Sequence, residues 1–281
     1  MPEEIDAIVR HLVTRHGVKK VRLTGGDPTA RTDLIDIITR IAKIDGIEDL
    51  AMTTNGLSLA SRAKAYADAG LGRVNVSLDS LDAEQFAEMT GIDGLQRVLH
   101  GIDVALETGL TPLKINSVVV RGQNESQIPL LVRYAASRGI SIRFIELMPM
   151  GPLGDQWSER YVSEREMKSM LDDTVASWTE LPQGSDSART YRAELVGSGS
   201  VDIGFITPMS CNFCADCNRV RIASDGSLYP CLMDRPTGSI LEAVRPRFDP
   251  EAFDHLLREG LAQKAPEHPS RGFVTMTIIG G

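Results

Sequence analysis

The sequence predicts an α/β protein in which a parallel, barrel-like sheet is followed by a smaller C-terminal lobe. Two observations predict the sheet: short β-branched runs alternate five times with amphipathic helical segments over residues 1–150, and most of these segments end on a glycine. A third observation, the break of this alternation in residues 151–281, predicts the lobe. Periodicity alone leaves an open doubly wound sheet as an alternative to the barrel.

Length and composition narrow the class of protein. With 281 residues and 42% apolar content, the chain can bury a substantial core as one large domain or two moderate ones. The formal net charge of −8 argues against a nucleic-acid-binding protein, because a polyanion requires a basic face. No apolar run is long enough to cross a bilayer, and the start is a polar amphipathic helix rather than a secretory signal. We therefore expect a cytoplasmic protein without a membrane partner.

Five strand–helix units are expected in residues 1–150. The strands are VRLTGG from Val21, EDLAMTTNG from Glu48, GRVNVSLDS from Gly72, PLKINSVVV from Pro112 and SIRFIELM from Ser141. The helices between them are LIDIITRIAKI, LASRAKAYADAG, LQRVLHGIDVALETG and IPLLVRYAASRG. A helix over MPEEIDAIVRHLVTRHG precedes the first strand.

Polar residues lie at the C-terminal ends of these predicted strands, which is where α/β sheets bind ligands. Each of these residues alone is as well explained by an ordinary turn or loop. Their recurrence on five strands predicts a ligand site at one mouth of the sheet. The residues are Arg22, Thr24, Gly25, Gly26, Asp27, Pro28, Thr53, Thr54, Asn55, Gly56, Asn75, Ser77, Asp79, Lys114, Asn116, Arg143, Glu146 and Met148.

The C-terminal part has weaker periodicity. Ser163 and Glu166 predict a capping box at the start of a helix over SEREMKSML, and the turn-rich LPQGSDSARTYRAELVGSGS predicts a β excursion. A last helix is expected near DPEAFDHLLREGLAQ. The chain ends on Gly280 and Gly281, which are either a frayed terminus or a backbone segment that can approach a ligand closely.

All four cysteines lie between Cys211 and Cys231. Cys214 and Cys217 form a CxxC, and the alternation around an Asp-Gly pair predicts a hairpin that returns Cys231 to them. Three converging thiolates suit a zinc ion or an iron–sulfur cluster. Because Cys211 forms a second CxxC with Cys214, a four-cysteine zinc site is an alternative, as are simple buried thiols.

Taken together, the motifs resemble the GTP 3′,8-cyclases of molybdenum cofactor biosynthesis, a family of radical S-adenosylmethionine lyases. The resemblance covers essentially all 281 residues, and Asn-Arg-x-Arg after the CxxC with the closing Gly-Gly is its most specific part. It implies a partial TIM-like (β/α) barrel with a C-terminal iron–sulfur lobe. It also implies that GTP is converted to a 3′,8-cyclised GTP by S-adenosylmethionine radical chemistry. The motifs that carry it are KKVRLTGGDP, TTNG, NVSLDS, LKINSVVV, IRFIELM, FCADCNRVRIASDGSLYPC and the terminal IGG.

The resemblance also implies ligands for individual residues. A 4Fe-4S cluster with one open iron facing the guanine would be held by Cys214, Cys217 and Cys231, with Cys211 as a spare thiol. The residues implied to contact GTP are Arg22, Thr53, Lys114, Arg219, Val220 and Arg221. Those implied to contact S-adenosylmethionine are Gly26, Ser77 and Met148, while Gly280 and Gly281 form the tail that reaches the family's active site.

Two departures from the family pattern affect the expected activity. Asp27 stands where the family commonly has Glu in its GGEP, and the family's CxxxCxxC for the radical-generating 4Fe-4S cluster is not in the sequence. We expect that the sequence as written lacks that N-terminal segment, with its first strand and a GTP-binding arginine, and does not cleave S-adenosylmethionine. The alternatives are a non-catalytic GTP- and metal-binding remnant and a zinc-stabilised α/β protein. A homodimer and an electron donor are the family's further partners.

Overall fold

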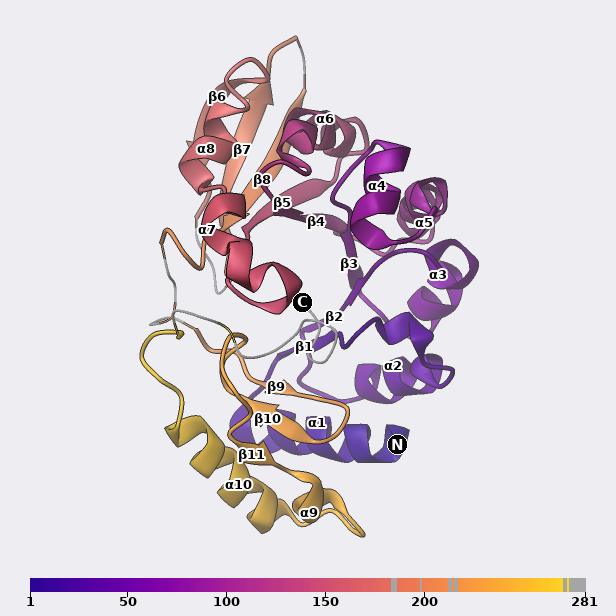
Figure 1. Ribbon diagram of the computed structural model, residues 1–281. Coiled ribbons are helices and arrows are strands. Elements are labelled where there is room, and N and C mark those ends of the chain that lie inside the picture. The colour runs from indigo at the N-terminus through magenta and orange to yellow at the C-terminus, as the bar shows by residue number, and fades with distance from the viewer. Residues whose placement is uncertain (183–185, 198, 212–213, 215–216, 270–271, 273–281) are drawn as a thin grey trace.

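A curved eight-stranded sheet organises the protein, as a computed structural model shows for residues 1–182, 186–197, 199–211, 214, 217–269 and 272 (Figure 1). The strand order is β1-β2-β3-β4-β5-β8-β7-β6. Strands β1 to β5 and β8 run parallel, whereas β7 and β6 continue the sheet as an antiparallel pair. The strands are β1 (Lys20–Leu23), β2 (Asp49–Thr54), β3 (Arg73–Ser77), β4 (Lys114–Val119), β5 (Ser141–Glu146), β6 (Val175–Glu180), β7 (Arg189–Leu195) and β8 (Ser200–Ile206).

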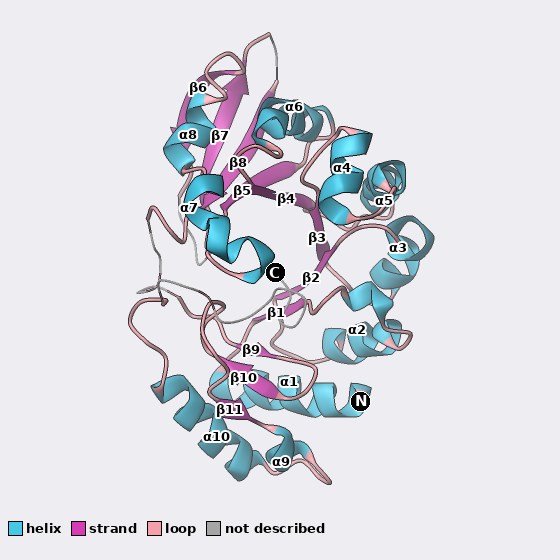
Figure 2. Ribbon diagram, in the orientation of Figure 1, coloured by secondary structure: helices cyan, strands magenta, loops and turns pink. Residues whose placement is uncertain are grey.

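Helices α2 to α6 line the outer, convex side of this sheet (Figure 2). This one-sided cover is what a barrel requires, because a doubly wound sheet carries helices on both faces. The predicted barrel-like α/β fold is therefore confirmed. The helices are α1 (Pro2–His16), α2 (Leu34–Ala42), α3 (Leu59–Asp68), α4 (Ala83–Thr90), α5 (Leu95–Glu107), α6 (Ile128–Ser137), α7 (Trp157–Arg160), α8 (Glu164–Ser169), α9 (Leu241–Val244) and α10 (Pro250–Ala262), with 3₁₀ turns at Pro28–Ala30, Glu125–Gln127 and Gly151–Gln156.

All five strands expected in residues 1–150 form, and so do the helices expected between them. Helices α3, α5 and α6 are followed by Gly70, Gly109 and Gly139 with positive φ, the conformation in which glycine ends a helix without a Cβ clash. The Ser163 capping box opens α8 as predicted. The sequence did not predict α4, a helix of eight residues that buries a single residue, Phe86.

The main core lies between the sheet and its helices. Its largest fully buried side chains include Tyr66, Phe144 and Phe205. The same core contains Val162 and Met167, which follow residue 150, and β6 to β8 belong to the same sheet as β1 to β5. The division of the chain at residue 150 remains a prediction, but the sheet continues past it.

A second, smaller core supports the C-terminal lobe. A three-stranded sheet of β9 (Arg221–Ile222), β10 (Ser227–Tyr229) and β11 (Gly238–Ser239) packs with α9 and α10 around Leu228, Ile240, Phe253 and Leu257. Ile8 and Leu12 of α1 pack against this core, while Val9 and Val13 of α1 face the main core. Helix α1 therefore joins the lobe to the barrel. Among the described residues, no helix is long and apolar enough to cross a membrane.

Candidate functional site

Four cations project from the face of the sheet that points away from the helices. Arg22, Arg73, Lys114 and Arg143 lie on β1, β3, β4 and β5. Their strand neighbours pack into the main core, so the alternation of side chains directs the cations to the opposite face. Asp186, in the loop between β6 and β7, is the shared counter-ion of two of them: its Oδ2 lies 2.7 Å from Arg143 Nη2 and 3.7 Å from Lys114 Nζ. Arg73 instead forms an ion pair with Asp49, with Nη2 2.6 Å from Oδ2.

The pKa values of these cations show that positive charge is concentrated here. Burial, together with repulsion by Arg73 and Arg143, lowers the pKa of Arg22 to about 10. Arg22 nevertheless keeps contact with solvent, which leaves its guanidinium accessible to a ligand. Burial and the charge of Arg143 also lower the pKa of Lys114, and Asp186 offsets only part of this effect. Cations that lie this close together and repel one another can bind a polyanion, because its negative charge offsets their repulsion.

The position of this basic group corrects the expectation that the polar residues gather at the strand ends. Lys114 is the first residue of β4, and Arg22 and Arg143 are the third residues of β1 and β5. The strand register places them at neighbouring heights along the sheet. Arg22 and Arg73 both pair with the same residue of β2. Lys114 and Thr53 both pair with Asn75 of β3. Thr53 Oγ1 also accepts a hydrogen bond from Asn75 Nδ2 at 3.3 Å. The cations therefore lie inside the barrel.

The loops at the C-terminal ends of β1 and β2 are tied together by Asp27. Its Oδ1 accepts a hydrogen bond from the Thr29 backbone N–H at 2.8 Å, and its Oδ2 accepts from Asn55 N at 2.6 Å and Thr54 Oγ1 at 3.0 Å. The shorter carboxylate at this position thus holds the backbone that carries Gly26. Gly26 is exposed at this edge of the sheet.

The other two residues implied to contact S-adenosylmethionine lie at the ends of β3 and β5. Ser77 is the last residue of β3 and is exposed. Met148, two residues past β5, packs against a small apolar cluster of Met150, Tyr229 and Met233, and Cys231 packs against the same cluster. The sulfur side chains of the barrel edge and of the C-terminal lobe therefore share one apolar wall.

A buried glutamate at the end of β5 connects the barrel to the segment before the cysteines. Glu146 is 1% exposed, and its Oε2 accepts hydrogen bonds from the backbone N–H groups of Met209 and Ser210, both at 3.0 Å. Its Oε1 accepts from Tyr161 Oη at 2.9 Å, from Glu164 N at 3.2 Å and from the Ser210 hydroxyl. The sequence placed Glu146 among the strand-end residues, but its contacts with a segment more than 60 positions away gave no sequence signal.

The predicted hairpin before Cys231 is confirmed. Strands β9 and β10 pair antiparallel, with Arg221 opposite Tyr229, two residues before Cys231. Cys217 N donates a hydrogen bond to the Cys214 carbonyl at 3.2 Å, which holds these two cysteines close in the chain. Arg221 is close enough to Cys217 and Cys231 for both thiols to affect its pKa, which burial and Arg219 lower to about 10.

The environment of Cys217 favours the thiolate. Burial alone would raise the pKa of this thiol, but the hydrogen bond from the Arg219 backbone and the charges of Arg219 and Lys264 lower it overall. Lys264, just after α10, also donates to the Cys217 carbonyl at 2.7 Å. A deprotonated thiol is the form that binds a metal. Cys211 differs from Cys217, because its side chain is exposed.

Cys214, Cys217 and Cys231 offer three sulfur ligands, which suit either a zinc ion or an iron–sulfur cluster. In the described residues, the one group of three ligand atoms that all lie within 4.8 Å of one another contains no cysteine. Gly280 and Gly281 lie outside the described residues.

Family models match both halves of the chain: the "Radical SAM superfamily" over residues 1–135 and "Molybdenum Cofactor Synthesis C" over residues 140–270. The chain is 40% identical over 266 residues to a GTP 3′,8-cyclase of Alkaliphilus metalliredigens, covering 95% of this chain and 80% of that protein. It is 39% identical to a GTP 3′,8-cyclase of Pelotomaculum thermopropionicum, covering 95% and 81%. The Pseudomonas putida GTP 3′,8-cyclase is 38% identical, with 95% and 79% covered.

A solved structure with the same fold is that of SuiB from Streptococcus suis. It superimposes with a TM-score of 0.58 over 94% of this chain and 60% of SuiB, at 16% sequence identity. SuiB bound to S-adenosylmethionine gives the same TM-score over 91% of this chain and 60% of SuiB, again at 16% identity. At this level of identity the likeness concerns the fold, and it agrees with a curved, mainly parallel sheet.

Proposed function

Since the chain belongs to the GTP 3′,8-cyclase family of radical S-adenosylmethionine enzymes, we propose that it binds GTP inside its barrel, beside an iron–sulfur cluster held by its C-terminal cysteines. The observation that carries the proposal is the position of Arg221. This arginine lies close to the thiols of Cys217 and Cys231 and also to Arg22 of β1. Arg221 therefore lies between the cysteines of the lobe and the cations of the barrel.

The triphosphate is the part of GTP that the basic group suits. Guanidinium groups bind phosphate oxygens through paired N–H donors, and a lysine adds a point charge. Arg22, Lys114, Arg219 and Arg221 supply these groups, and Thr53 supplies a hydroxyl one level along the sheet. Val220, between the two arginines, packs its side chain against the smaller core and so fixes their spacing. Local positive charge outweighs the acidic total of the chain.

The three cysteines are proposed as cluster ligands. A 4Fe-4S cluster held by three thiolates leaves one iron open to a nitrogen or oxygen of the guanine. Cys217 contributes a thiol whose pKa is already lowered. Cys231 follows the β9–β10 hairpin and packs against the apolar cluster of Met150, Tyr229 and Met233. Cys211 is not needed in this arrangement.

S-adenosylmethionine is proposed to bind at the C-terminal edge of the sheet. Gly26 lets a ligand approach its backbone closely, Ser77 offers a hydroxyl, and Met148 offers a soft apolar surface. The barrel positions both molecules and keeps water away from the reacting carbon atoms. The tail glycines Gly280 and Gly281, a homodimer, an electron donor and a cytoplasmic location belong to the proposal on the strength of the resemblance alone.

Anaerobic reconstitution of the 281-residue chain with iron and sulfide, followed by a GTP titration, tests this proposal. We expect about four irons and four sulfides per chain. Cys231→Ser should lose this iron, while the matched control Cys211→Ser keeps it. Arg22→Gln should weaken GTP binding at least about tenfold, the effect of losing one charge-assisted contact.

Two results would contradict the proposal. Zinc bound without acid-labile sulfide would replace the cluster with a structural metal site. Equal iron content in both cysteine variants would show that Cys231 is not a ligand.

A further inference from the structure

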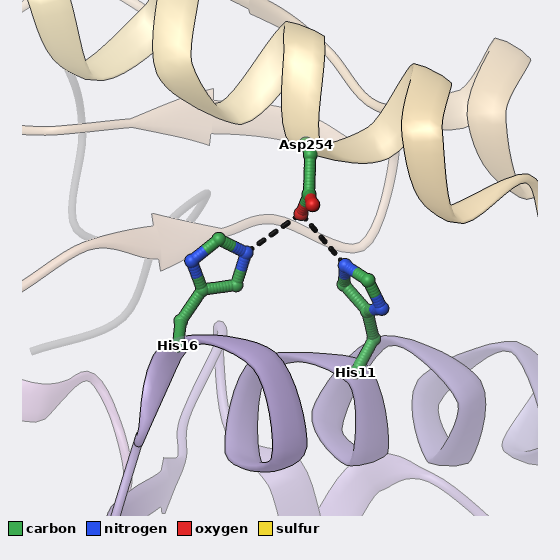
Figure 3. A group of neighbouring side chains, drawn as sticks. All are labelled: His11, His16 and Asp254. Carbon is green, nitrogen blue, oxygen red and sulfur yellow. Dashed lines mark hydrogen bonds and ion pairs between the residues drawn. The ribbon is translucent and has the colours of Figure 1, made fainter.

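A second set of ligand atoms converges far from the cysteines, where α1 meets α10 (Figure 3). His11 Nε2 lies 2.7 Å and His16 Nε2 lies 2.6 Å from the same atom, Asp254 Oδ1. All three ligand atoms lie within 4.8 Å of one another. The two imidazoles come from consecutive turns of α1, and both point their Nε2 atoms at the carboxylate of α10.

Apolar packing holds this group in place. The ring of His11 lies 5.4 Å from the rings of both Phe248 and Phe253, centroid to centroid, and its side chain is only 12% exposed. The His16 side chain is 35% exposed, so the group opens to solvent on that side. Because α1 and α10 are joined by the smaller core, the position of the group does not depend on the His–Asp contacts alone.

The donor set identifies the class of ligand. Two imidazoles and one carboxylate are the ligands of zinc and related divalent transition metals, which take three protein ligands and a water in a tetrahedral site. Calcium and magnesium prefer sites made of oxygen atoms, and a single carboxylate offers them too few. Arg15 is a nearby competing cation, with Nε 3.7 Å from Asp254 Oδ2, but its side chain is 72% exposed and can turn toward solvent.

We propose that His11, His16 and Asp254 bind one divalent ion of the zinc class, which links the first helix of the barrel to the last helix of the C-terminal lobe. Metal–ligand bonds of about 2.0–2.2 Å place neighbouring ligand atoms about 3.4 Å apart. The two nitrogen–oxygen separations therefore widen by about 0.7 Å as the ion replaces both hydrogen bonds, which small side-chain rotations provide.

The linkage would act on the lobe that carries the cysteines. Helix α10 leads directly into Lys264, which holds the Cys217 carbonyl, and α1 contributes to both cores. An ion that binds only when α1 and α10 are together stabilises the folded chain and, with it, the docking of the lobe. The site uses nitrogen and oxygen atoms, so it is chemically separate from the thiols and independent of the proposed function.

The test uses the full chain after its cysteines have been loaded with iron and sulfide, titrated anaerobically with Zn²⁺ or Co²⁺. Gel-filtered protein should retain one added ion per chain, and a hundredfold excess over Kd should raise Tm by about 5 °C. The difference between the spectra recorded before and after Co²⁺ is added should show only weak visible bands, without the intense sulfur-to-cobalt absorption that new thiolate ligands would produce.

His16→Gln is the informative variant, because this side chain is peripheral and its loss leaves His11 packed against Phe248 and Phe253. It should lose both the ion and the Tm shift, while the control His255→Gln, which changes an exposed histidine of α10, keeps both. Thiolate-type cobalt absorption, no retained ion, or equal binding by His16→Gln would overturn the proposal and leave the group as a hydrogen-bonded contact.

Discussion

The basic group of the barrel and the cysteine segment of the lobe are held in very different ways. Arg22, Lys114 and Arg143 project from strands of four to six residues whose neighbours are fixed by backbone pairing. The cysteines lie outside helices and strands, and Cys231 follows a short strand pair of two and three residues. The barrel therefore keeps its cations in position although they repel one another, whereas the thiols depend on a few side-chain anchors.

This difference shows two ways in which a protein can hold the side chains of a binding site in position. A sheet can hold groups of like charge close together, because the main core supplies the stability that offsets their repulsion. A segment with little core of its own must be tied to the sheet by specific contacts, of which Glu146 and Lys264 are the clearest. The two parts should consequently respond to mutation in different ways.

The largest expected effect comes from removing the anchor of the cysteine segment. Glu146→Gln keeps the size of the side chain but places an NH₂ group against backbone N–H donors that now face a carboxylate. We expect the free energy of unfolding to fall by about 3 kcal/mol, since a buried charged acceptor with several donors is lost. Iron retained after reconstitution should fall as well. Chemical denaturation and iron analysis measure the two effects.

The matched control is Glu180→Gln, which changes an exposed glutamate on β6 in the same chemical way. It should leave stability within about 0.5 kcal/mol and iron content unchanged. If Glu146→Gln lost stability but kept all its iron, the segment would be held by contacts other than those of Glu146.

A smaller effect, of opposite sign, is expected on the barrel side. Asp186→Asn removes the carboxylate that lies 2.7 Å from Arg143, so the basic group loses its shared counter-ion and attracts an anion more strongly. Asp186 is 47% exposed, which limits the gain. We expect GTP to bind about tenfold more tightly, or about 1.4 kcal/mol, with a steeper loss of affinity as salt is added.

Titration calorimetry at two salt concentrations measures this change, and Asp172→Asn, an exposed aspartate after α8, is the control. Weaker GTP binding by Asp186→Asn would mean that the carboxylate orders Lys114 and Arg143 for the ligand instead of competing with it.

The two regions also differ in how far the sequence could predict them. The strands of residues 1–150 follow from local β-branched runs, and the hairpin before Cys231 follows from its turn residues. Register is not a local property, which is why the cations were expected at the strand ends rather than inside the sheet. The contacts of Glu146 with Met209 and Ser210 could not be predicted from the sequence for the same reason. His11 and Asp254 are 243 residues apart, and only the folded chain brings them together.

The smallest expected effect tests how well the strand framework tolerates a buried charge. Asp79 follows β3 and accepts a hydrogen bond from the Val118 N–H of β4 at 2.8 Å, but burial dominates and raises its pKa to about 6 from an ordinary value of 3.8. Because the folded state binds this proton more tightly than the unfolded state, the group adds stability as the pH falls through 6, and this contribution is lost as the pH rises again.

Between pH 7 and pH 5 the wild-type chain should therefore gain about 1 kcal/mol of unfolding free energy relative to Asp79→Asn, which has no proton to bind at this position. Asparagine keeps an oxygen to accept the Val118 N–H, so both proteins retain that hydrogen bond, and their difference isolates the titration. Urea denaturation of the two proteins at both pH values measures it. A difference that stayed constant with pH would show that Asp79 is ionised in the folded barrel, and that the strand backbone stabilises buried negative charge as firmly as it holds the cations.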